Sequence, residues 1–406
     1  MRKTPIANRT IFCLTLLSVA PAAAQERWTE DDVTERARAQ AVEVLAADAR
    51  ARLAEGEAQG AGLLPNPSVE WERQEAFAPN AQTQDIIRLV VPLDLSGRPA
   101  TRRALAEVEA RLSEAEAERV RLDAVAAARA AFHRALAAER RVAVLEAQRD
   151  ALREALRVME SRRAAGEVSG YETARLAIGA QLAGSRAAQA RIDADAARQQ
   201  LAALFGAEPP DALEGELTPP SPPPIAALVT SAEARRPDLS ALARADEAAR
   251  RARAAADFSW VPRLSVEGGY NRQDGPLVGH GYAVGLSAEI PLFDHGQGER
   301  RAAEASAAVG DLRARYEAVV ETRIRVSHAR LTRLLEERAR FESESAEPVE
   351  LLVRAATSGY QGGERSVVEL LDARRAATEV AERRVALSLA ARLAQIALAR
   401  EAGGLR

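Results

Sequence analysis

Several residue types are scarce in this chain of 406 residues, and each shortage excludes a class of protein. The one cysteine is Cys13, inside an N-terminal apolar stretch, so we expect neither a disulfide nor a lipid anchor in the exported chain. Aromatic residues make up 4% of the chain and charged residues 28%, which favours elongated helices over one large globular core. Acidic and basic residues nearly cancel at a net charge of −3, which argues against a nucleic-acid partner.

The N-terminus has the pattern of a secretory signal. Basic residues precede an apolar stretch from Ile11 to Ala20, and Ala22-Ala23-Ala24 follows as a cleavage motif. The stretch is about half of the roughly 20 residues that a membrane-spanning helix needs. We therefore predict a signal peptide over 1–24. No later stretch approaches that length, so any membrane insertion must use strands closed into a barrel.

The chain repeats its own pattern after 197 to 199 residues, as Pro65 and Pro262, or Gly97 and Gly296, illustrate. Such a long offset indicates a duplicated domain and not a solenoid. A proline-rich linker, 209–224, separates the copies. We predict a first repeat over 25–208 with a hairpin at 67–93, and a second over 225–406 with a hairpin at 263–292.

Short segments rich in β-branched and aromatic residues predict the strands, and long segments with apolar residues at steps of three and four predict the helices. The expected strands are 67–77, 84–93, 263–271 and 280–292, with loops around Pro79-Asn80 and Pro276. The expected helices are 30–61, 98–165, 170–205, 231–257, 299–357 and 364–401, with a possible kink at Pro348. The shorter helices should stack end to end along the long ones, because their combined lengths match.

No motif supports catalysis, a cofactor or a metal site. The four histidines are His133, His280, His295 and His328, and none has a histidine or glutamate at the spacing that a metal site needs. We therefore expect that the protein is not an enzyme.

The order of these features resembles the outer-membrane efflux protein family, the TolC-like factors. The resemblance rests on the repeats, on Gly62-Leu63-Leu64-Pro65-Asn66-Pro67 before the first strand, and on Ile290-Pro291-Leu292-Phe293-Asp294 before a helix. The segment 89–98, followed by Arg102-Arg103, is most similar to the CzcC-type, cation-efflux branch.

The resemblance implies a mainly α fold with a small β part, in which three chains form a 12-stranded transmembrane β-barrel and a long α-helical coiled-coil tunnel. It places the protein in the outer membrane of a Gram-negative bacterium, with a periplasmic helical extension. Its implied partners are two further copies, a periplasmic adaptor (membrane fusion protein), an inner-membrane RND-type pump and outer-membrane lipid. Four strands per chain also require oligomerisation on their own account, because about eight are the minimum for a closed barrel.

The resemblance also implies roles for the two turns between helices. It makes these turns the adaptor-docking tips, with the candidate residues Gly166, Glu167, Ser169, Gly363, Glu364 and Ser366. Such glycines also end helices, and both roles can hold. It further implies a channel gate at Arg365, Glu369 and Asp372, in which threefold symmetry makes two acidic rings. Glu369 stands where the family's best-known residue is aspartate, and a solvated helix face is the alternative explanation.

Three functions remain open at this point. The first is a trimeric exit duct of a tripartite efflux system for heavy-metal cations, and a multidrug efflux duct shares its architecture. The second is the outer-membrane component of a type I protein secretion system. The third, a periplasmic scaffold without a pore, is disfavoured by the strand hairpins.

Overall fold

The computed structural model describes residues 26–76, 82–94, 97–258, 260–275, 278–290 and 292–404. Several sequence-based predictions concern residues outside these ranges. They are the signal peptide 1–24 with Cys13, the loop residues Pro79-Asn80 and Pro276, and Pro291.

The longest element is helix α3, Arg98–Ala164, whose 67 residues span about 100 Å at 1.5 Å per residue. It begins after Gly97, which has a φ of 71°, and Pro99 occupies its first turn, where the missing N–H costs no hydrogen bond. Leu145, Leu152 and Met159 are buried at steps of seven residues. The predicted helix over 98–165 is therefore confirmed, and the buried steps of seven residues have the spacing of a coiled-coil seam.

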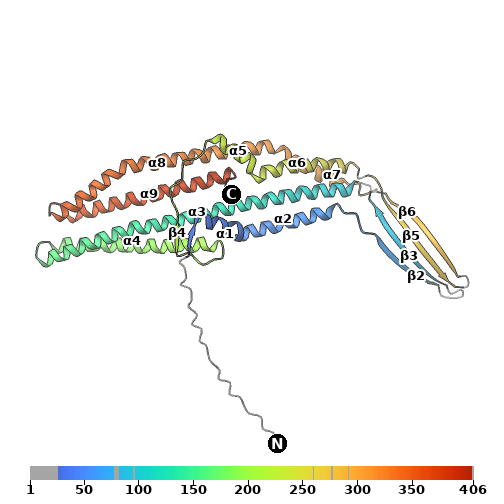
Figure 1. Cartoon of the computed structure of the whole chain (residues 1–406), viewed down its shortest axis with the longest axis horizontal. Helices are drawn as coiled ribbons and strands as arrows, with labels where there is room; N and C mark the ends of the chain where they lie inside the picture. Colours follow the sequence, from blue (N-terminus) through green and yellow to red (C-terminus); the bar gives the residue numbers. More distant parts are fainter. Residues whose placement is uncertain are drawn as a thin grey trace, which may run out of the picture.

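Shorter helices lie end to end along α3, as predicted (Figure 1). Helices α1 (Glu30–Gln40) and α2 (Val42–Ala61) pack on its first half, and α4 (Gly170–Ala203) packs on its second half. The prediction of one helix over 30–61 is wrong in one detail, since Ala41 is extended with a ψ of 127°. No glycine or proline marks this break. Ala41 is buried at 5% exposure, so tertiary packing sets the position.

The second half repeats this arrangement with more breaks. Helices α5 (Ile225–Arg235) and α6 (Pro237–Ala256) replace the single helix predicted for 231–257, because Pro237 starts a new helix. Helices α7 (Gln297–Asp311) and α8 (Arg313–Gln361) replace the one predicted for 299–357, and α9 spans Val367–Glu401. Helix α8 continues through Pro348, so the interruption lies at Leu312 instead.

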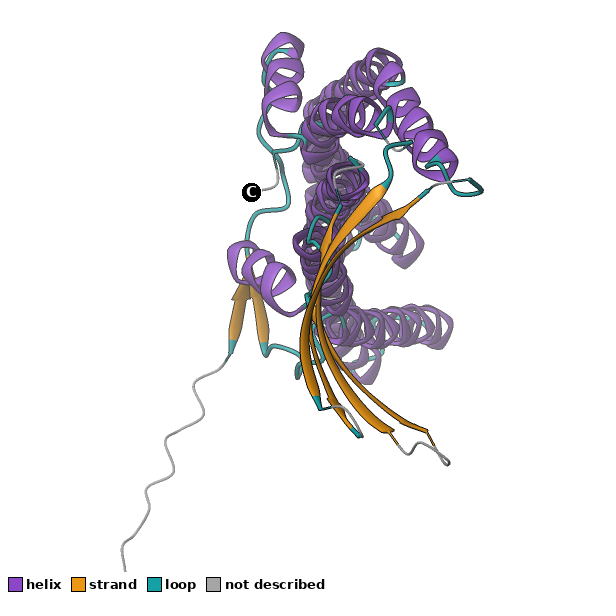
Figure 2. Cartoon of the chain, turned by 90° about the vertical axis from the view of Figure 1, so that its right-hand side faces the viewer, coloured by secondary structure: helices purple, strands orange, loops and turns teal. Residues whose placement is uncertain are grey.

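The two predicted hairpins form one antiparallel sheet (Figure 2). Its strands are β2 (Ser68–Ala76), β3 (Gln82–Leu93), β5 (Arg263–Asp274) and β6 (Gly279–Glu289), in that order across the sheet. The strand predictions are confirmed to within about three residues at each end. Pairing of β3 with β5 joins the two halves of the chain, with Leu93 opposite Leu264 and Thr83 opposite Asp274.

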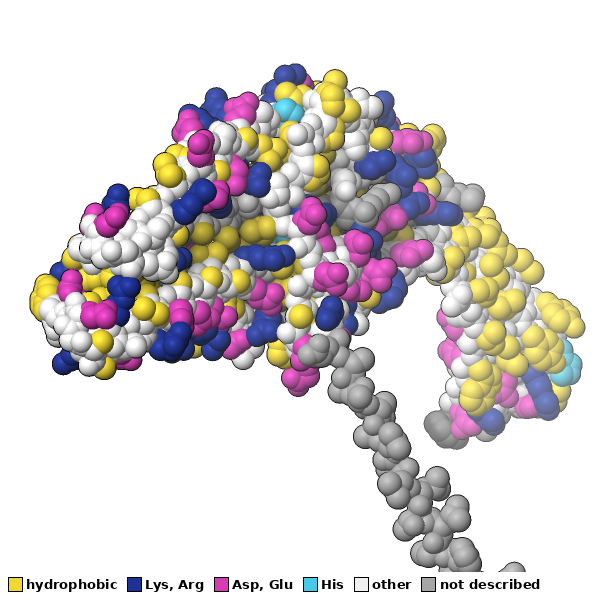
Figure 3. Space-filling view, turned by 60° about the vertical axis from the view of Figure 1, so that its left-hand side comes forward, with side chains coloured by type: hydrophobic (Ala, Val, Ile, Leu, Met, Phe, Trp, Pro, Cys, Tyr) yellow, Lys and Arg dark blue, Asp and Glu magenta, His cyan; other side chains and the backbone are white. Residues whose placement is uncertain are grey.

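The two faces of this sheet differ in polarity because successive side chains alternate. The register aligns Trp71, Ile87, Tyr270 and Tyr282 in one row of the apolar face. Exposed apolar side chains cover this face from its junction with the helices to a charged far end (Figure 3). The apolar side chains that are more than a third exposed are Val69, Trp71, Ile87, Leu89, Leu93, Val266, Tyr282, Val284 and Leu286. The other face carries Glu70, Glu72, Arg88 and Glu267.

A small parallel sheet that sequence reasoning missed lies at mid-height. Strand β1 (Arg27–Thr29) pairs with β4 (Ala212–Glu214), which belongs to the proline-rich linker. Trp28, Phe132 and Leu136 form the core beneath it. Gly215 follows β4, and a Cβ there would lie 3.4 Å from the Phe132 ring. Three-residue strands are too short for a periodic signal, so only the tertiary structure reveals this pairing.

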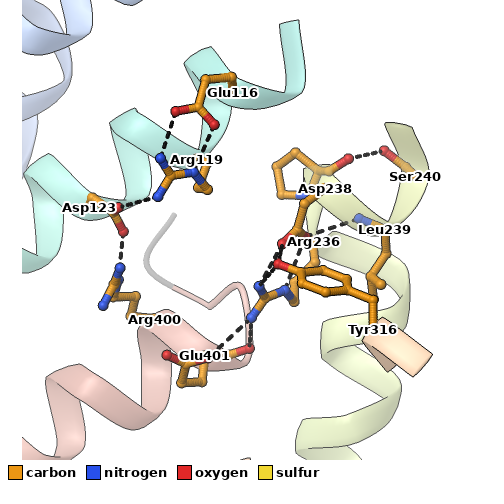
Figure 4. A network of polar contacts seen from close by, with 11 residues as sticks. Glu116, Arg119, Asp123, Arg236, Asp238, Leu239, Ser240, Tyr316, Arg400 and Glu401 are labelled. Atoms are coloured by element: carbon orange, nitrogen blue, oxygen red, sulfur yellow. Dashed lines mark hydrogen bonds and ion pairs between the residues drawn. The ribbon is translucent and has the colours of Figure 1, made fainter. Parts of the chain in front are cut away.

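A polar network near the C-terminus holds the second half together (Figure 4). Arg236, between α5 and α6, donates to Asp238 Oδ2 at 2.6 Å and to the Glu401 carbonyl at 3.0 Å. The Tyr316 hydroxyl on α8 donates to the same Asp238 oxygen at 2.6 Å. Arg400 bonds Asp123 of α3 at 2.5 Å. These contacts connect α6, α8 and the end of α9 to the first half of the chain. Across the described ranges, no helix is long and apolar enough to cross a membrane.

Candidate functional site at the helical tips

Two turns form the end of the molecule opposite the sheet (Figure 1). One joins α3 to α4 through Gly166, and the other joins α8 to α9 through Gly363. Both glycines have a positive φ, 77° and 78°, which other residues adopt only with strain. Just past each glycine, an amide N–H donates back to a carbonyl of the preceding helix. The Glu167 amide donates to the Arg162 carbonyl at 3.0 Å, and the Glu364 amide donates to the Gly359 carbonyl at 2.8 Å. Both glycines therefore end helices in the same way.

The helix that leaves each tip begins with a capping box, which the sequence analysis overlooked. Ser169 and Glu172 form one at α4, and Ser366 and Glu369 form the other at α9. In the second box, the Ser366 amide donates to Glu369 Oε2 at 2.9 Å, and the Glu369 amide donates to Ser366 Oγ at 3.4 Å. The signal was present in the sequence, because a serine stands three residues before a glutamate in both places.

The two tips pack against each other. Arg162 of the first tip donates to the Gln361 carbonyl of the second at 2.7 Å. Met159 and Leu176 from the first hairpin share a buried cluster with Val367 from the second. Gly179 allows α9 to approach closely, because a Cβ there would lie 2.8 Å from the Leu371 side chain. The predicted tip residues thus belong to one packed unit.

Two of the candidate gate residues, Glu369 and Asp372, lie on the exposed face of the first two turns of α9, and Arg365 directly precedes its N-cap. Val367, Leu370 and Ala373 are buried, whereas Arg365, Glu369 and Asp372 are exposed. Arg365 Nη1 donates to Glu369 Oε1 at 3.1 Å. Hydrogen bonds from the Ser366 amide and hydroxyl lower the pKa of Glu369, and Arg365 contributes further. Glu369 is therefore an anion at neutral pH.

The capping box gives a physical reason for an acidic residue at this position. Both carboxylate oxygens of Glu369 are held within the chain, one by Ser366 and the other by Arg365. The third helical residue of a capping box favours glutamate or glutamine, whose length lets the side chain reach back to the N-cap amide. Aspartate can fill the same place, as Asp32 does in the capping box of Thr29 at the start of α1, so capping accounts for an acidic residue here and not for glutamate in particular.

The histidines do not form a site with one another. His133 is buried and lies 3.2 Å from Glu30 Oε2, and His328 contacts the Pro223 carbonyl at 3.1 Å. His280 bonds the Tyr270 hydroxyl at 2.6 Å on the sheet. No group of three or more histidine, cysteine, aspartate or glutamate side chains with the arrangement of a metal site occurs among the residues that the structure describes.

Comparison with known sequences identifies relatives of this chain. The family described as outer membrane efflux protein matches residues 228–404. The cobalt-zinc-cadmium resistance protein CzcC of Cupriavidus metallidurans is 26% identical over 338 residues, which cover 79% of this chain and 77% of that protein.

Solved structures share the fold at lower sequence identity. The open state of the Neisseria gonorrhoeae outer membrane channel MtrE superposes with a TM-score of 0.74 at 17% identity, covering 93% of this chain and 89% of MtrE. CusC, described in terms of transmembrane channel formation, gives 0.73 at 15% identity and 92% of each chain. The Vibrio cholerae outer membrane protein VceC gives 0.72 at 18% identity, covering 92% of this chain and 96% of VceC.

Proposed function

Because this chain belongs to the outer membrane efflux protein family, we propose that it is the exit duct of a tripartite efflux system for heavy-metal cations. A sheet with one apolar face lies at one end of the molecule, and two packed polar tips lie at the other, about 100 Å of helix away. This separation is the observation that carries the proposal. It suits a conduit with one end in the outer membrane and the other deep in the periplasm.

Three copies would complete the duct. In the described part of the chain, β2 and β6 are the edges of a four-stranded sheet, so each has one side free to pair with a strand of another copy. Three such sheets make 12 strands, enough to close a barrel of useful diameter. The apolar face would then meet lipid, and the face with Glu70, Glu72, Arg88 and Glu267 would line the lumen.

The tips would carry the gate and the docking surface. Around a threefold axis, Glu369 and Asp372 form two acidic rings one helical turn apart. The ring carboxylates would attract cations and pair with Arg365 of a neighbouring copy in the closed state. Glu369 would have to leave its own cap to do so, which makes the capping box a competitor of the closed gate. The tip residues Gly166, Glu167, Ser169, Gly363, Glu364 and Ser366 would contact a periplasmic adaptor that links the duct to an RND-type pump.

Metal cations are the substrate class that the relatives favour. CzcC is named for cobalt, zinc and cadmium resistance, and it aligns with most of this chain. The duct itself needs no tight metal site, because a conduit must release what it passes. The relatives are channels, which fits a protein without catalytic function.

The substrate proposal is tested by growth of a deletion strain on divalent metals and, separately, on lipophilic drugs, with complementation by the wild-type chain. Sensitivity to metals alone is the expected result. Sensitivity to drugs alone would replace the metal proposal with a multidrug duct, and loss of a secreted polypeptide without either sensitivity would indicate type I secretion.

The gate assignment has its own test. The double variant Glu369→Ala, Asp372→Ala should raise single-channel conductance in planar bilayers and reduce cation selectivity. Glu172→Ala is a matched control, because it removes the equivalent capping glutamate from the other tip. Unchanged conductance and selectivity in the double variant would show that these residues form no gate.

A further inference from the structure

The apolar surface of the molecule continues past the ends of the strands onto the junction between sheet and helices. Six side chains here, which we call the junction collar, are each more than half exposed. They are Leu63, Leu64, Phe258, Trp260, Leu292 and Phe293. Leu63 and Trp260 stand at equivalent places in the internal repeat, so both halves of the chain contribute.

The sheet alone is too short to match the apolar thickness of an outer membrane. On β3 the apolar face runs from Leu93 to Ile87, and the next row contains Arg73, Asp85 and Arg272. Six residues at about 3.4 Å, tilted by roughly 40°, cover about 15 Å along the membrane normal. The apolar band of such proteins is about 25 Å tall. About 10 Å of apolar surface must therefore come from beyond the strands.

An ion pair anchors the chain next to the collar at Asp294. Arg98, at the start of α3, has a side chain that is 5% exposed and donates to Asp294 Oδ2 at 3.1 Å. This ion pair ties the junction of the second half to that of the first. Phe293 precedes Asp294 and is 91% exposed. Phe293 thus adds to a contiguous exposed apolar patch, and such patches mark interaction surfaces.

The side chains next to the collar suit a phospholipid surface. Tryptophan, which Trp260 supplies here, is favoured where hydrocarbon meets headgroups, because its ring is apolar and its N–H is polar. Exposed Arg102 and Arg301 follow at equivalent places, five residues after Gly97 and Gly296, the glycines with positive φ that start α3 and α7. Arginine at that level can reach phosphate groups while its stem stays on apolar surface.

From this geometry we infer that the junction collar is a phospholipid-binding surface, seated at the headgroup boundary of the leaflet nearer the helices. The inference rests on the proposed function, since it takes the sheet to span the outer membrane. It adds that the membrane boundary lies on the helix–strand junction and not at the strand ends. The membrane-facing surface thus includes residues outside the sheet.

Tryptophan fluorescence tests this placement in the full chain, reconstituted in phospholipid vesicles. The variant Trp71→Phe keeps Trp260 and Trp28, and Trp28 is 1% exposed at mid-height, far from the sheet. The fluorescence of Trp260 is the emission of this variant minus the emission of the double variant Trp71→Phe/Trp260→Phe. Lipids brominated near the headgroup end of the acyl chain should quench most of that difference signal, and acrylamide in the water should quench little.

Each other outcome overturns the inference. Quenching of Trp260 by acrylamide alone would place the collar in water, and quenching by neither agent would place it against another copy of the chain. The matched variant Trp260→Phe reports Trp71 on the apolar face of the sheet. If brominated lipid fails to quench Trp71 as well, the sheet is not in the bilayer and the proposed function itself fails. Quenching of Trp71 without Trp260 rejects the collar alone.

Discussion

Neutralising Glu30 should weaken the attachment of α1 to α3 in a pH-dependent way. Glu30 is the first residue of α1, and its carboxylate bonds Arg129 and lies 3.2 Å from the His133 Nε2, both on α3. Burial opposes the charge, but the polar contact with His133 and the charge of Arg129 outweigh it, and they lower the pKa of Glu30 from 4.5 to about 2. Arg392 also faces this carboxylate.

The magnitude follows from that pKa difference. It corresponds to roughly 3 kcal/mol, of which solvent screening at a side chain that is 24% exposed leaves about 2 kcal/mol. Because the folded-state pKa is depressed, this stability is fully present above pH 4.5 and is lost as the pH falls toward about 2. Glu30→Gln should therefore cost about 2 kcal/mol at pH 7 and almost nothing near pH 2.

Denaturant unfolding, monitored by Trp28 fluorescence, measures the change in the free energy of unfolding at each pH. Trp28 reports on this region because it lies two residues before Glu30 and is part of the core beneath α1. The background Trp71→Phe, Trp260→Phe leaves Trp28 as the sole tryptophan. Asp31→Asn is the control, since it removes an exposed carboxylate from the same helical turn and should change stability by a few tenths of a kcal/mol. An equal cost of Glu30→Gln at both pH values would refute the electrostatic explanation.

Other positions give further predictions. Ser366→Ala removes an N-cap, which costs about 1 kcal/mol and should make the first amides of α9 exchange with solvent about fivefold faster, while Ser366→Thr should not. Hydrogen exchange measures the exchange rates of these amides, and unchanged rates in Ser366→Ala would mean that the cap is not formed. Gly363→Ala should lower the melting temperature of the tip. Residue 363 has a φ of 78°, and an alanine there is strained by roughly 1 kcal/mol. Arg236→Met should destabilise by more than about 2 kcal/mol, because it leaves the Asp238 carboxylate, 17% exposed, with one fewer partner. A loss below half of that value in urea unfolding would show that Tyr316 alone suffices.

Sequence reasoning succeeded where the signal is local. The bounds of α3 follow from a long stretch without glycine or proline inside it, and the strands follow from alternation between apolar and polar residues. The tip glycines and the S-x-x-E pattern at Ser366 are also local signals, although the second was overlooked. Sequence reasoning failed at Ala41, where packing alone sets the helix break, and at the three-residue strands β1 and β4.

The candidate site shows the same division. The sequence placed Glu369 and Asp372 on one helical face, because residues three apart are neighbours on a helix, and both are exposed in the structure. It contained no information on the contact of Arg162 with the Gln361 carbonyl, which brings the two tips together. Whether those exposed residues act as a gate stays a prediction.

The sequence by itself determined the duplicated order of elements, the lengths of α3, α4 and α9, and the two faces of each strand, since these depend on backbone preference and periodicity within a few residues. Only the tertiary structure decided that β3 pairs with β5, that the linker supplies a strand to β1, and that Arg98 binds Asp294 across 196 positions. Such contacts join segments whose local sequences are compatible with many partners. They are selected by the packing of the whole chain, in which each helix and strand limits where the others can lie.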